Sequence, residues 1–422
     1  MSSPLPLYTI RTRETPPMKN RLVLLAEYVT SPAVELTPHD ASSLRRAVTT
    51  MSVVPSSDVP GRYDLTPGSE VGVVALDSCC IVIRPKVPID RVLFLVSYAL
   101  DSANWREKAA LYNTAEDIVE GMAAVFAHEL RRALRRGLLQ GYRSTEDALT
   151  TVRGRIRFDE QLRRRFGVPL PLEVRFDEYT EDTELNRVLR AALWRLSRLP
   201  IRSRHVRSML GFCSAVLADA VTLIEYPRDA LPEFRWDRLN QHYRVAAELA
   251  LMILRSTSVE LAEGRAVGTG FVIDMNVVFE EFVRTALREA LGLAPAIFPS
   301  GSKASVVLDE RAKIRLEPDL SWWIGGSCVF VGDAKYKRIS VKGINHPDLY
   351  QLLAYTVALR LSAGLLVYAA GEAEWVEHTV VHAGKRLEVT TVDLTGSPEQ
   401  ILADIARIAD RVKALRAPVR CG

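Results

Sequence analysis

The spacing of apolar and polar residues along the first hundred positions is typical of short strands. Three apolar runs carry this pattern, at residues 21–28, 71–76 and 79–84. Asp77 and Ser78 separate the last two runs and predict a hairpin. Thr37 followed by Pro38 predicts a helix start, with Thr as the N-cap and Pro in the first turn. We therefore expect residues 1–105 to form a β-rich N-terminal module.

The middle of the chain has a helical period instead. Between residues 115 and 139, the apolar side chains of Ile118, Met122, Val125 and Leu130 recur every three to five positions. The same period predicts further helices at residues 183–197, 204–220 and 239–255. Residues 106–264 are thus expected to form a mostly helical middle domain.

The pattern changes again after a turn-rich stretch at residues 263–270. One helix, several short strands, a second helix and another strand follow, and a helix near residues 398–415 ends the series. This alternation predicts an α/β domain over residues 265–422. The fold class expected for the whole chain is multidomain α/β.

Composition supports a soluble globular protein, because 48% of the 422 residues are hydrophobic and 25% are charged. The most apolar stretches, residues 92–100 and 246–254, are shorter than the about 20 residues that cross a bilayer. The five cysteines show no CxxC spacing, and no cationic and apolar signal segment opens the chain. We therefore expect a cytoplasmic location and no membrane role.

The net charge of +4 does not by itself indicate nucleic-acid binding. Arginines are nevertheless clustered in three places, at residues 131–136, 163–165 and 202–207. Such clusters contact phosphates in some proteins and cover helix surfaces in others, and the sequence leaves both interpretations open.

Two segments in the C-terminal region carry the candidate chemistry. Residues 315–322 (RLEPDLSW) alternate polar and apolar side chains, so a strand here would place Asp319 on the polar face. Residues 329–337 (VFVGDAKYK) predict a second strand with Asp333 and Lys335 on one face. Pairing of the two strands would bring the three side chains together.

Asp319, Asp333 and Lys335 suit the hydrolysis of a phosphodiester. That reaction needs neutralised phosphate charge, an activated water and a stabilised leaving oxygen, which a Mg²⁺ held by carboxylates supplies. Mg²⁺ takes one or two carboxylates and keeps several waters, and the two aspartates provide that number. Lys335 would orient or help to deprotonate the attacking water. The alternative is that two strands carry Asp and Lys on their solvent faces by chance.

Neighbouring segments favour the catalytic interpretation. A helix around residues 277–283 can deliver a third carboxylate, from Glu280 or Glu281. Gln351 and Tyr355 lie at i and i+4, on one face of the helix after the second strand. Apolar runs such as residues 364–370 are typical of central strands.

The order of these motifs resembles that of the PD-(D/E)xK nucleases, and most closely their RecB-type branch, which carries the Gln and Tyr. The resemblance implies a restriction-endonuclease-like C-terminal domain that uses Mg²⁺. It implies a catalytic set of Asp319, Asp333, Lys335, Glu280, Gln351 and Tyr355, with Asp319, Asp333 and Glu280 as metal ligands. Glu280 is preferred to Glu281 because it follows the phenylalanine of the motif.

Other segments resemble the McrC family, the nuclease subunits of McrBC modification-dependent (5-methylcytosine) restriction systems. They occur in the family's order between about residues 85 and 370: GY at 141–142, VRGRI at 152–156, FDEYTEDTELNR at 176–187, RLNQHY at 238–243 and FVIDMN at 271–276. The Arg153-Gly154-Arg155 and Asn186-Arg187 pieces have no catalytic role that chemistry assigns. Maintenance of the fold is favoured for them, with contact to DNA or a partner as the alternative.

This resemblance implies an endonuclease subunit that acts on methylated DNA together with a separate AAA+ GTPase. The N-terminal portion of the family docks on that motor and stimulates its GTP hydrolysis. In agreement with a need for a partner, the chain has no GxxxxGK[ST] loop. A homodimer within the complex is compatible with the sequence, which leaves the oligomeric state open.

Two other functions remain open from the sequence. The chain could bridge and activate a GTPase without cutting DNA, which a strongly altered nuclease motif would favour. It could also be a RecB-like nuclease of another DNA repair or defence system, which the middle-domain motifs argue against.

Overall fold

The chain folds into two compact units. The computed structural model describes residues 21–112, 117–262, 265–299, 301–338, 346–370 and 375–418. One unit, the middle unit, is Met122–Phe271. The other, here the two-segment unit, combines Lys19–Gly121 with Val272–Gly422. In the parts of the chain just given, no helix combines the length and apolar character needed to span a membrane.

The first segment of the two-segment unit contributes strands to two sheets. Its elements are β1 (Leu22–Ala26), β2 (Ser31–Glu35), α1 (Pro38–Ala47), β3 (Ser52–Pro55), β4 (Arg62–Thr66), β5 (Glu70–Ala75), β6 (Cys80–Arg84), α2 (Ile89–Leu100), the 3-10 turn η1 (Trp105–Lys108) and α3 (Ala109–Tyr112). Strand β6 runs parallel to β1 and antiparallel to β5, while β4 lies between β2 and β3.

Three expectations for this segment are confirmed, and several further elements are new. The Thr37 side chain caps α1 by accepting a hydrogen bond from the Asp40 backbone N–H. The β5–β6 hairpin forms where Asp77 and Ser78 predict it. Strand β1 lies within the predicted run at 21–28. The apolar run at residues 92–100 forms most of helix α2. Within this helix, all residues from Val92 to Tyr98 are buried.

The middle unit is helical with a long strand ribbon. Its elements are α4 (Ile118–Leu134, which begins in the other unit), β7 (Gly141–Leu149), β8 (Arg155–Ile156), α5 (Phe158–Arg165), β9 (Leu172–Thr180), α6 (Glu184–Ser197), α7 (Arg204–Ala218), η2 (Gln241–Tyr243), α8 (Arg244–Ser256), β10 (Thr257–Ala262) and β11 (Arg265–Asp274, which ends in the other unit). The four predicted helices are present, with ends that differ by a few residues.

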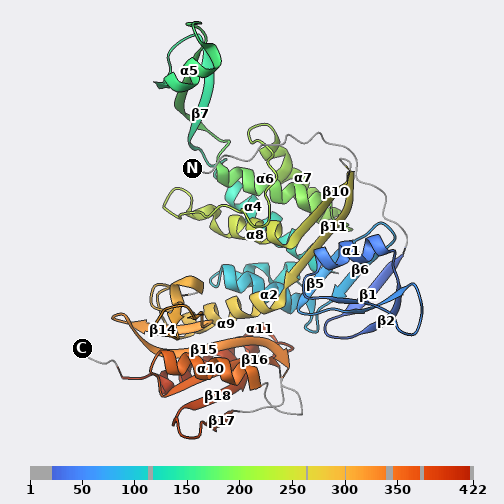
Figure 1. Cartoon of the computed structure of the whole chain (residues 1–422), viewed down its shortest axis with the longest axis vertical. Helices are drawn as coiled ribbons and strands as arrows, with labels where there is room; N and C mark the ends of the chain where they lie inside the picture. The colour runs from blue at the N-terminus through green and yellow to red at the C-terminus, as the bar shows by residue number, and fades with distance from the viewer. Residues whose placement is uncertain are drawn as a thin grey trace. The chain divides into compact units, whose positions relative to one another are not determined.

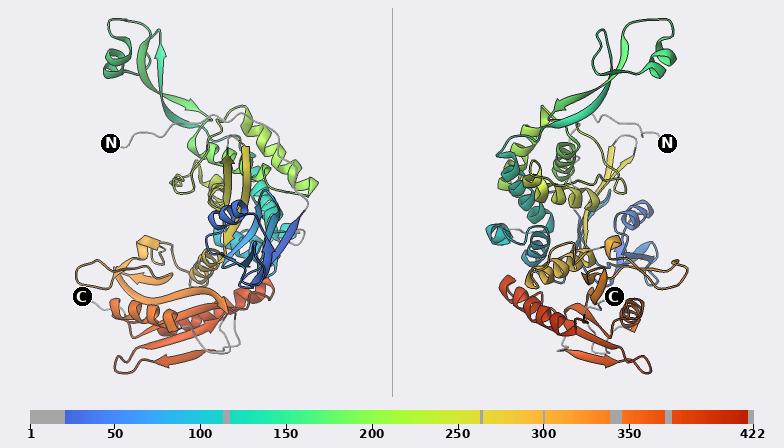
Figure 2. Two further views of the ribbon diagram at one scale, coloured as in Figure 1. Left: turned by 45° about the vertical axis from the view of Figure 1, so that its right-hand side comes forward. Right: turned by 90° about the vertical axis from the view of Figure 1, so that its left-hand side faces the viewer.

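The β7–β9 ribbon corrects the expectation of a mostly helical region at this point. The two strands pair antiparallel over nine residues each, β8 adds to the edge of β9, and α5 lies at the far end (Figures 1 and 2). Most side chains on β7 are polar and at least partly exposed, so this strand has no apolar alternation to reveal it. The backbone ladder and ion pairs such as Arg175 with Glu146 hold it instead.

The family motifs of the middle unit have structural roles. Arg187 donates to Asp182 through two nitrogens, and Thr222 donates to the same carboxylate. Asn186 is fully buried and donates to the backbone carbonyls of Leu139 and Glu181. These contacts join the ends of the ribbon to α6 and favour maintenance of the fold over contact with DNA.

Gly154 in the Arg153-Gly154-Arg155 motif has a similar structural explanation. Its φ is +72°, and a Cβ at this position would lie 2.3 Å from the carbonyl oxygen of Arg175. The guanidinium of Arg153 stacks on the Phe176 ring at 4.0 Å. Only glycine fits this approach between two backbone segments.

The second segment of the two-segment unit is an α/β layer structure. Its elements are α9 (Met275–Ala290), η3 (Gly301–Ala304), β12 (Val306–Val307), β13 (Arg315–Leu316), β14 (Leu320–Ile324), β15 (Ser327–Arg338), α10 (His346–Ala358), β16 (Ala363–Ala370), β17 (Val376–Thr379), β18 (Arg386–Thr391) and α11 (Pro398–Leu415). The sheet order is β14-β15-β16-β18-β17, with β15, β16 and β18 parallel and both edge strands antiparallel.

Helices cover both faces of this sheet (Figure 1). On one face, Leu352 and Tyr355 of α10 pack with Val331 and Leu366 of the central strands. On the other face, Phe279 of α9 lies against Tyr336, and α11 packs against α9 and β16. Because alternate residues of a strand point to opposite faces, Val331, Asp333 and Lys335 share the α10 side, whereas Tyr336 points to the α9 side.

Gly332 gives a stability test of the central strand pair. A Cβ at Gly332 would lie 2.8 Å from the carbonyl oxygen of Leu365 on β16, so Gly332→Ala should destabilise the protein by about 1–3 kcal/mol through overpacking. Gly211 in α7 has no atom within 4 Å of an added Cβ. Gly211→Ala should therefore stabilise its helix by about 0.5–1 kcal/mol. Thermal unfolding of both variants checks this, and equal shifts would contradict the predicted close contact.

Candidate functional site

Asp319 reaches the centre of the site from a loop and not from a strand. The expected continuous strand over residues 315–322 is wrong, because β13 ends at Leu316 and β14 begins only at Leu320. Pro318 has no N–H to donate to a strand ladder, which explains the break. The Asp319 carboxylate accepts a hydrogen bond of 3.0 Å from the backbone N–H of Ala334 on β15. This bond fixes Asp319 beside the second motif.

Asp333 and Lys335 lie on one face of β15, as the sequence predicts. The Lys335 ammonium forms an ion pair with Asp333 and lies 3.9 Å from Asp319 Oδ2. The Asp333 side chain is fully buried, in contrast to the solvent-facing position that a chance match would give. The structure therefore brings together the three residues that the sequence places on two separate segments.

Burial and like charge dominate the electrostatics at Asp333. Burial and then the neighbouring Asp319 carboxylate raise the pKa of Asp333 well above its usual range, although Lys335 opposes the shift. Burial lowers the pKa of Lys335, but the charges of Asp333 and Asp319 outweigh it and the net pKa is raised. The lysine thus stays an ammonium between two carboxyl groups.

Glu280 on α9 belongs to the same electrostatic cluster. Burial, followed by the charge of Asp319, raises the pKa of Glu280 to about 7. Arg284, one helical turn later, lies 3.9 Å from Glu280 and forms an ion pair with Glu281. Of the two glutamates, Glu281 has the more exposed side chain, at 43% against 33%. The pKa of Glu280 is influenced by Asp319 and Lys335, so Glu280 remains the candidate for a third carboxylate at the site.

Gln351 and Tyr355 lie next to the site and hold the loop that carries Asp319, between β13 and β14. The Gln351 amide donates to the Tyr355 hydroxyl at 2.7 Å, and that hydroxyl donates to the Glu317 carbonyl at 3.3 Å. Tyr355 is buried in the core under α10. The pair therefore fixes the backbone two residues before Asp319.

The chemistry of the donor set fits a divalent cation. The Asp333 carboxylate is fully buried, and the ammonium of Lys335 contacts one of its oxygens as a charged partner. Oxygen ligands from one or two carboxylates, with water completing the shell, are what Mg²⁺ prefers. Across the described parts of the chain, no three His, Cys, Asp or Glu side chains are grouped closely enough to hold a metal together. Asp319 and Asp333 are therefore the principal candidate ligands, with Glu280 farther from them.

Three residues near the site are not singled out by their sequence motifs: Arg284, Lys337 and Asp348. Arg284 is 9% exposed and lies against Glu280. Lys337 continues the row of Asp333 and Lys335 and pairs at 3.2 Å with the buried carboxylate of Asp348. The i, i+4 spacing of Glu280 and Arg284 on one helix face would have revealed the first contact. The second joins β15 to α10 and is visible only in three dimensions.

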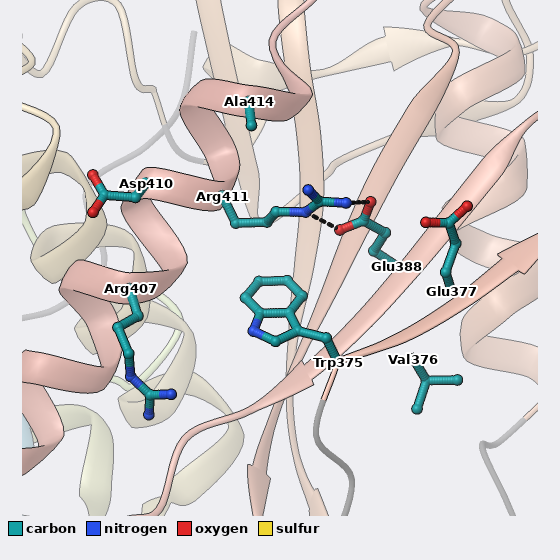
Figure 3. Close-up of a pocket in the computed structure, with 8 residues that line it drawn as sticks. All are labelled: Trp375, Val376, Glu377, Glu388, Arg407, Asp410, Arg411 and Ala414. Atoms are coloured by element: carbon teal, nitrogen blue, oxygen red, sulfur yellow. Dashed lines mark hydrogen bonds and ion pairs between the residues drawn. The ribbon is translucent and has the colours of Figure 1, made fainter.

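A separate pocket of about 520 Å³ lies between β17, β18 and α11 (Figure 3). Its wall includes Trp375 and the buried carboxylate of Glu388. Arg411 neutralises that carboxylate by donating to it at 2.7 Å, and Arg386 pairs with it at 3.2 Å. Because the buried Glu388 carboxylate is already paired with two arginines, this pocket lacks the strained carboxylate that marks the site around Asp333.

The arginines at 163–165 are mostly neutralised by neighbouring glutamates. Arg163 and Arg164 pair with Glu160, and Arg165 pairs with Glu173. For this cluster, the helix-surface interpretation is therefore favoured over phosphate binding.

Together, the fold and the site define a mixed α/β protein with a buried carboxylate and lysine centre. A sequence profile described as "McrBC 5-methylcytosine restriction system component" matches residues 65–369, which is more than half of the chain. The chain belongs to this family, and the resemblance read from its motifs is confirmed. No curated protein sequence gives a significant match.

Two of the solved structures that match this chain are from Thermococcus gammatolerans. A chain from the half-complex of a tetradecameric assembly of McrB AAA+ hexamers with bound McrC covers 93% of this chain and 100% of its own length, at 18% identity and a TM-score of 0.53. A chain from the cryo-EM structure of the McrBC complex covers 64% and 88%, at 19% identity and a TM-score of 0.40. At such identities, the likeness of the first chain concerns the fold.

The raised pKa values predict how stability without divalent cations depends on pH. An acid whose pKa rises from 4.5 to about 7 on folding contributes stability that is complete below its unfolded pKa and lost as the pH rises through about 7. Wild-type stability should therefore fall between about pH 5 and pH 8, with Asp333 contributing in the same direction. The stability of the Glu280→Gln variant should fall less over that range. Urea unfolding in EDTA measures both, and identical pH slopes would refute the assigned shift at Glu280.

Proposed function

We propose that this chain is the Mg²⁺-dependent DNA endonuclease subunit of a modification-dependent restriction complex, and that it works with a separate AAA+ GTPase. The buried Asp333 beside Asp319 and Lys335 is the observation that carries the proposal. Two further observations support the proposal: Glu280 on α9 lies close enough for Asp319 to raise its pKa, and the chain belongs to the McrBC family. In this proposal, residues 265–422 form a PD-(D/E)xK nuclease domain, which contains the second segment of the two-segment unit. Residues 1–105 form an N-terminal docking module, and residues 106–264 form a middle domain.

Each residue has a role that follows from its surroundings. Asp319 and Asp333 would hold Mg²⁺, which when bound offsets phosphate charge and makes water a better nucleophile. Glu280 is not grouped with them closely enough to complete a three-carboxylate site in this structure, and it would act as a nearby negative charge on α9. Lys335 keeps its proton between two carboxylates, so it orients the attacking water and neutralises a phosphate oxygen. Gln351 and Tyr355 hold the loop that presents Asp319.

DNA cleavage should depend on Asp333. In a reaction with the cognate AAA+ GTPase, methylated DNA, GTP and Mg²⁺, Asp333→Asn should lower the cleavage rate by roughly a hundredfold or more, because a neutral amide cannot replace the buried ligand. Asp410→Asn is the matched control, since it removes an exposed carboxylate that lines the other pocket. Gel assays of both variants test the site, and wild-type cleavage by Asp333→Asn would show that it is misassigned.

Stimulation of the GTPase should survive the loss of cutting. If the motor is activated through surfaces other than the cleavage centre, full-length Asp333→Asn should raise the partner's GTP hydrolysis as much as the wild-type chain does. Phosphate release by the partner, with and without each variant, measures this. Loss of stimulation in Asp333→Asn would mean that the two activities share one site. Full stimulation together with undiminished cutting would instead favour a bridging subunit that activates a different nuclease.

A further inference from the structure

Lys335 lies where β15 loses its regular neighbours. Pairing with β14 ends at Leu320 and Gly332, before the catalytic residues begin. Pairing with β16 is regular up to Lys335 and Tyr368, and then the register shifts before Arg338. The ladder alone therefore does not fix the strand immediately after Lys335, and other contacts must hold it there.

Tyr336 supplies those contacts on the face of β15 opposite Lys335. Its side chain is fully buried and lies near Phe279, which precedes Glu280. Lys86 of the first segment donates through Nζ to the Tyr336 carbonyl at 3.3 Å. The same ammonium lies 3.8 Å from the centre of the tyrosine ring. Residues after β6 thus hold both the backbone and the side chain of Tyr336.

Glu27, which follows β1, completes the cradle around Tyr336. Its Oε2 accepts hydrogen bonds from the Tyr336 hydroxyl at 3.2 Å and from the Lys86 backbone N–H at 2.8 Å. Glu27 is buried, its other oxygen has no hydrogen-bond partner, and burial raises its pKa to about 7. A packed apolar pair would fill this place without the desolvation cost of a buried carboxylate, so the arrangement is more specific than packing alone requires.

We propose that Tyr336 is a positioning residue for Lys335 and Asp333, and that Glu27 and Lys86 of the N-terminal segment hold it in place. The cleavage centre then depends on contacts made more than two hundred residues earlier in the chain. This inference rests on the proposed function. It adds that the N-terminal strands, besides any docking role, form part of the support of the nuclease centre.

The test uses the full-length chain with its cognate AAA+ GTPase, methylated DNA, GTP and Mg²⁺. Tyr336→Phe removes only the hydroxyl, and it should lower the maximal cleavage rate at least about tenfold through misplacement of Lys335. The DNA concentration at half-maximal rate should stay the same, because no group that contacts DNA is removed. Tyr226→Phe is the control, since it also removes the hydroxyl of a buried tyrosine that donates to a glutamate, at 2.8 Å to Glu184, but within the middle unit. Its cleavage rate should equal that of the wild type.

Variants of Glu27 separate positioning from general stability. Glu27→Gln keeps an acceptor for the tyrosine and should retain most of the cleavage rate, whereas Glu27→Leu, which also leaves the Lys86 N–H without its acceptor, should lose at least as much as Tyr336→Phe. Combining the two changes should cause no loss beyond that of Glu27→Leu alone, because the tyrosine hydroxyl then has no glutamate partner in either variant. Multiplying losses in the double variant would overturn the inference.

Asp333→Asn distinguishes this inference from the function on which it rests. Wild-type cleavage by Tyr336→Phe, with Asp333→Asn inactive, would reject the positioning role and leave the function intact. Wild-type cleavage by Asp333→Asn would reject both. The positioning role would also be rejected if Tyr226→Phe lost as much thermal stability and as much cleavage rate as Tyr336→Phe.

Discussion

The burial of the Asp333 carboxylate is the constraint around which the C-terminal sheet is arranged. A buried carboxylate is costly in a protein interior, and a second carboxylate nearby increases the cost. Lys335 offsets part of this charge, and the backbone bond from Ala334 to Asp319 keeps the second carboxylate in place. The protein thus retains an arrangement that opposes stability, which is typical of sites selected for chemistry.

The surroundings of Asp333 show how several elements share that cost. Helix α9 brings Glu280 together with Arg284, and α10 brings the hydroxyl of Tyr355 to the loop before Asp319. Glu27 and Lys86, which follow strands β1 and β6, hold Tyr336, the residue after Lys335. The centre is therefore supported from both faces of the sheet and from both segments of the two-segment unit.

Much of this could be predicted from the sequence, and the exceptions have physical reasons. Apolar period and N-cap signals located most helices, and the i, i+2 relation placed Asp333 with Lys335 correctly. Alternation failed at residues 315–322, because Pro318 interrupts the strand that the pattern suggests. It also failed at β7, whose side chains are mostly polar and which is held by its ladder and ion pairs.

The contacts of Tyr336 could not have been predicted at all, because they depend on distant segments. No local pattern links Glu27 or Lys86 to a tyrosine in β15, and only the folded chain brings them together. The pairing of Lys337 with Asp348 is hidden for the same reason. Local sequence rules thus located the chemical groups but not the residues that support them.

The split of one compact unit between the two ends of the chain affects how the protein is made. Domains generally fold as units during synthesis, from the N-terminus onward. Residues 19–121 leave the ribosome first, but the segment that packs with them begins only at Val272. The middle unit can therefore fold while the first segment still waits for its partner. The buried centre cannot form before Lys335 has been made, so a chain that ends before this residue would carry no assembled Asp319, Asp333 and Lys335.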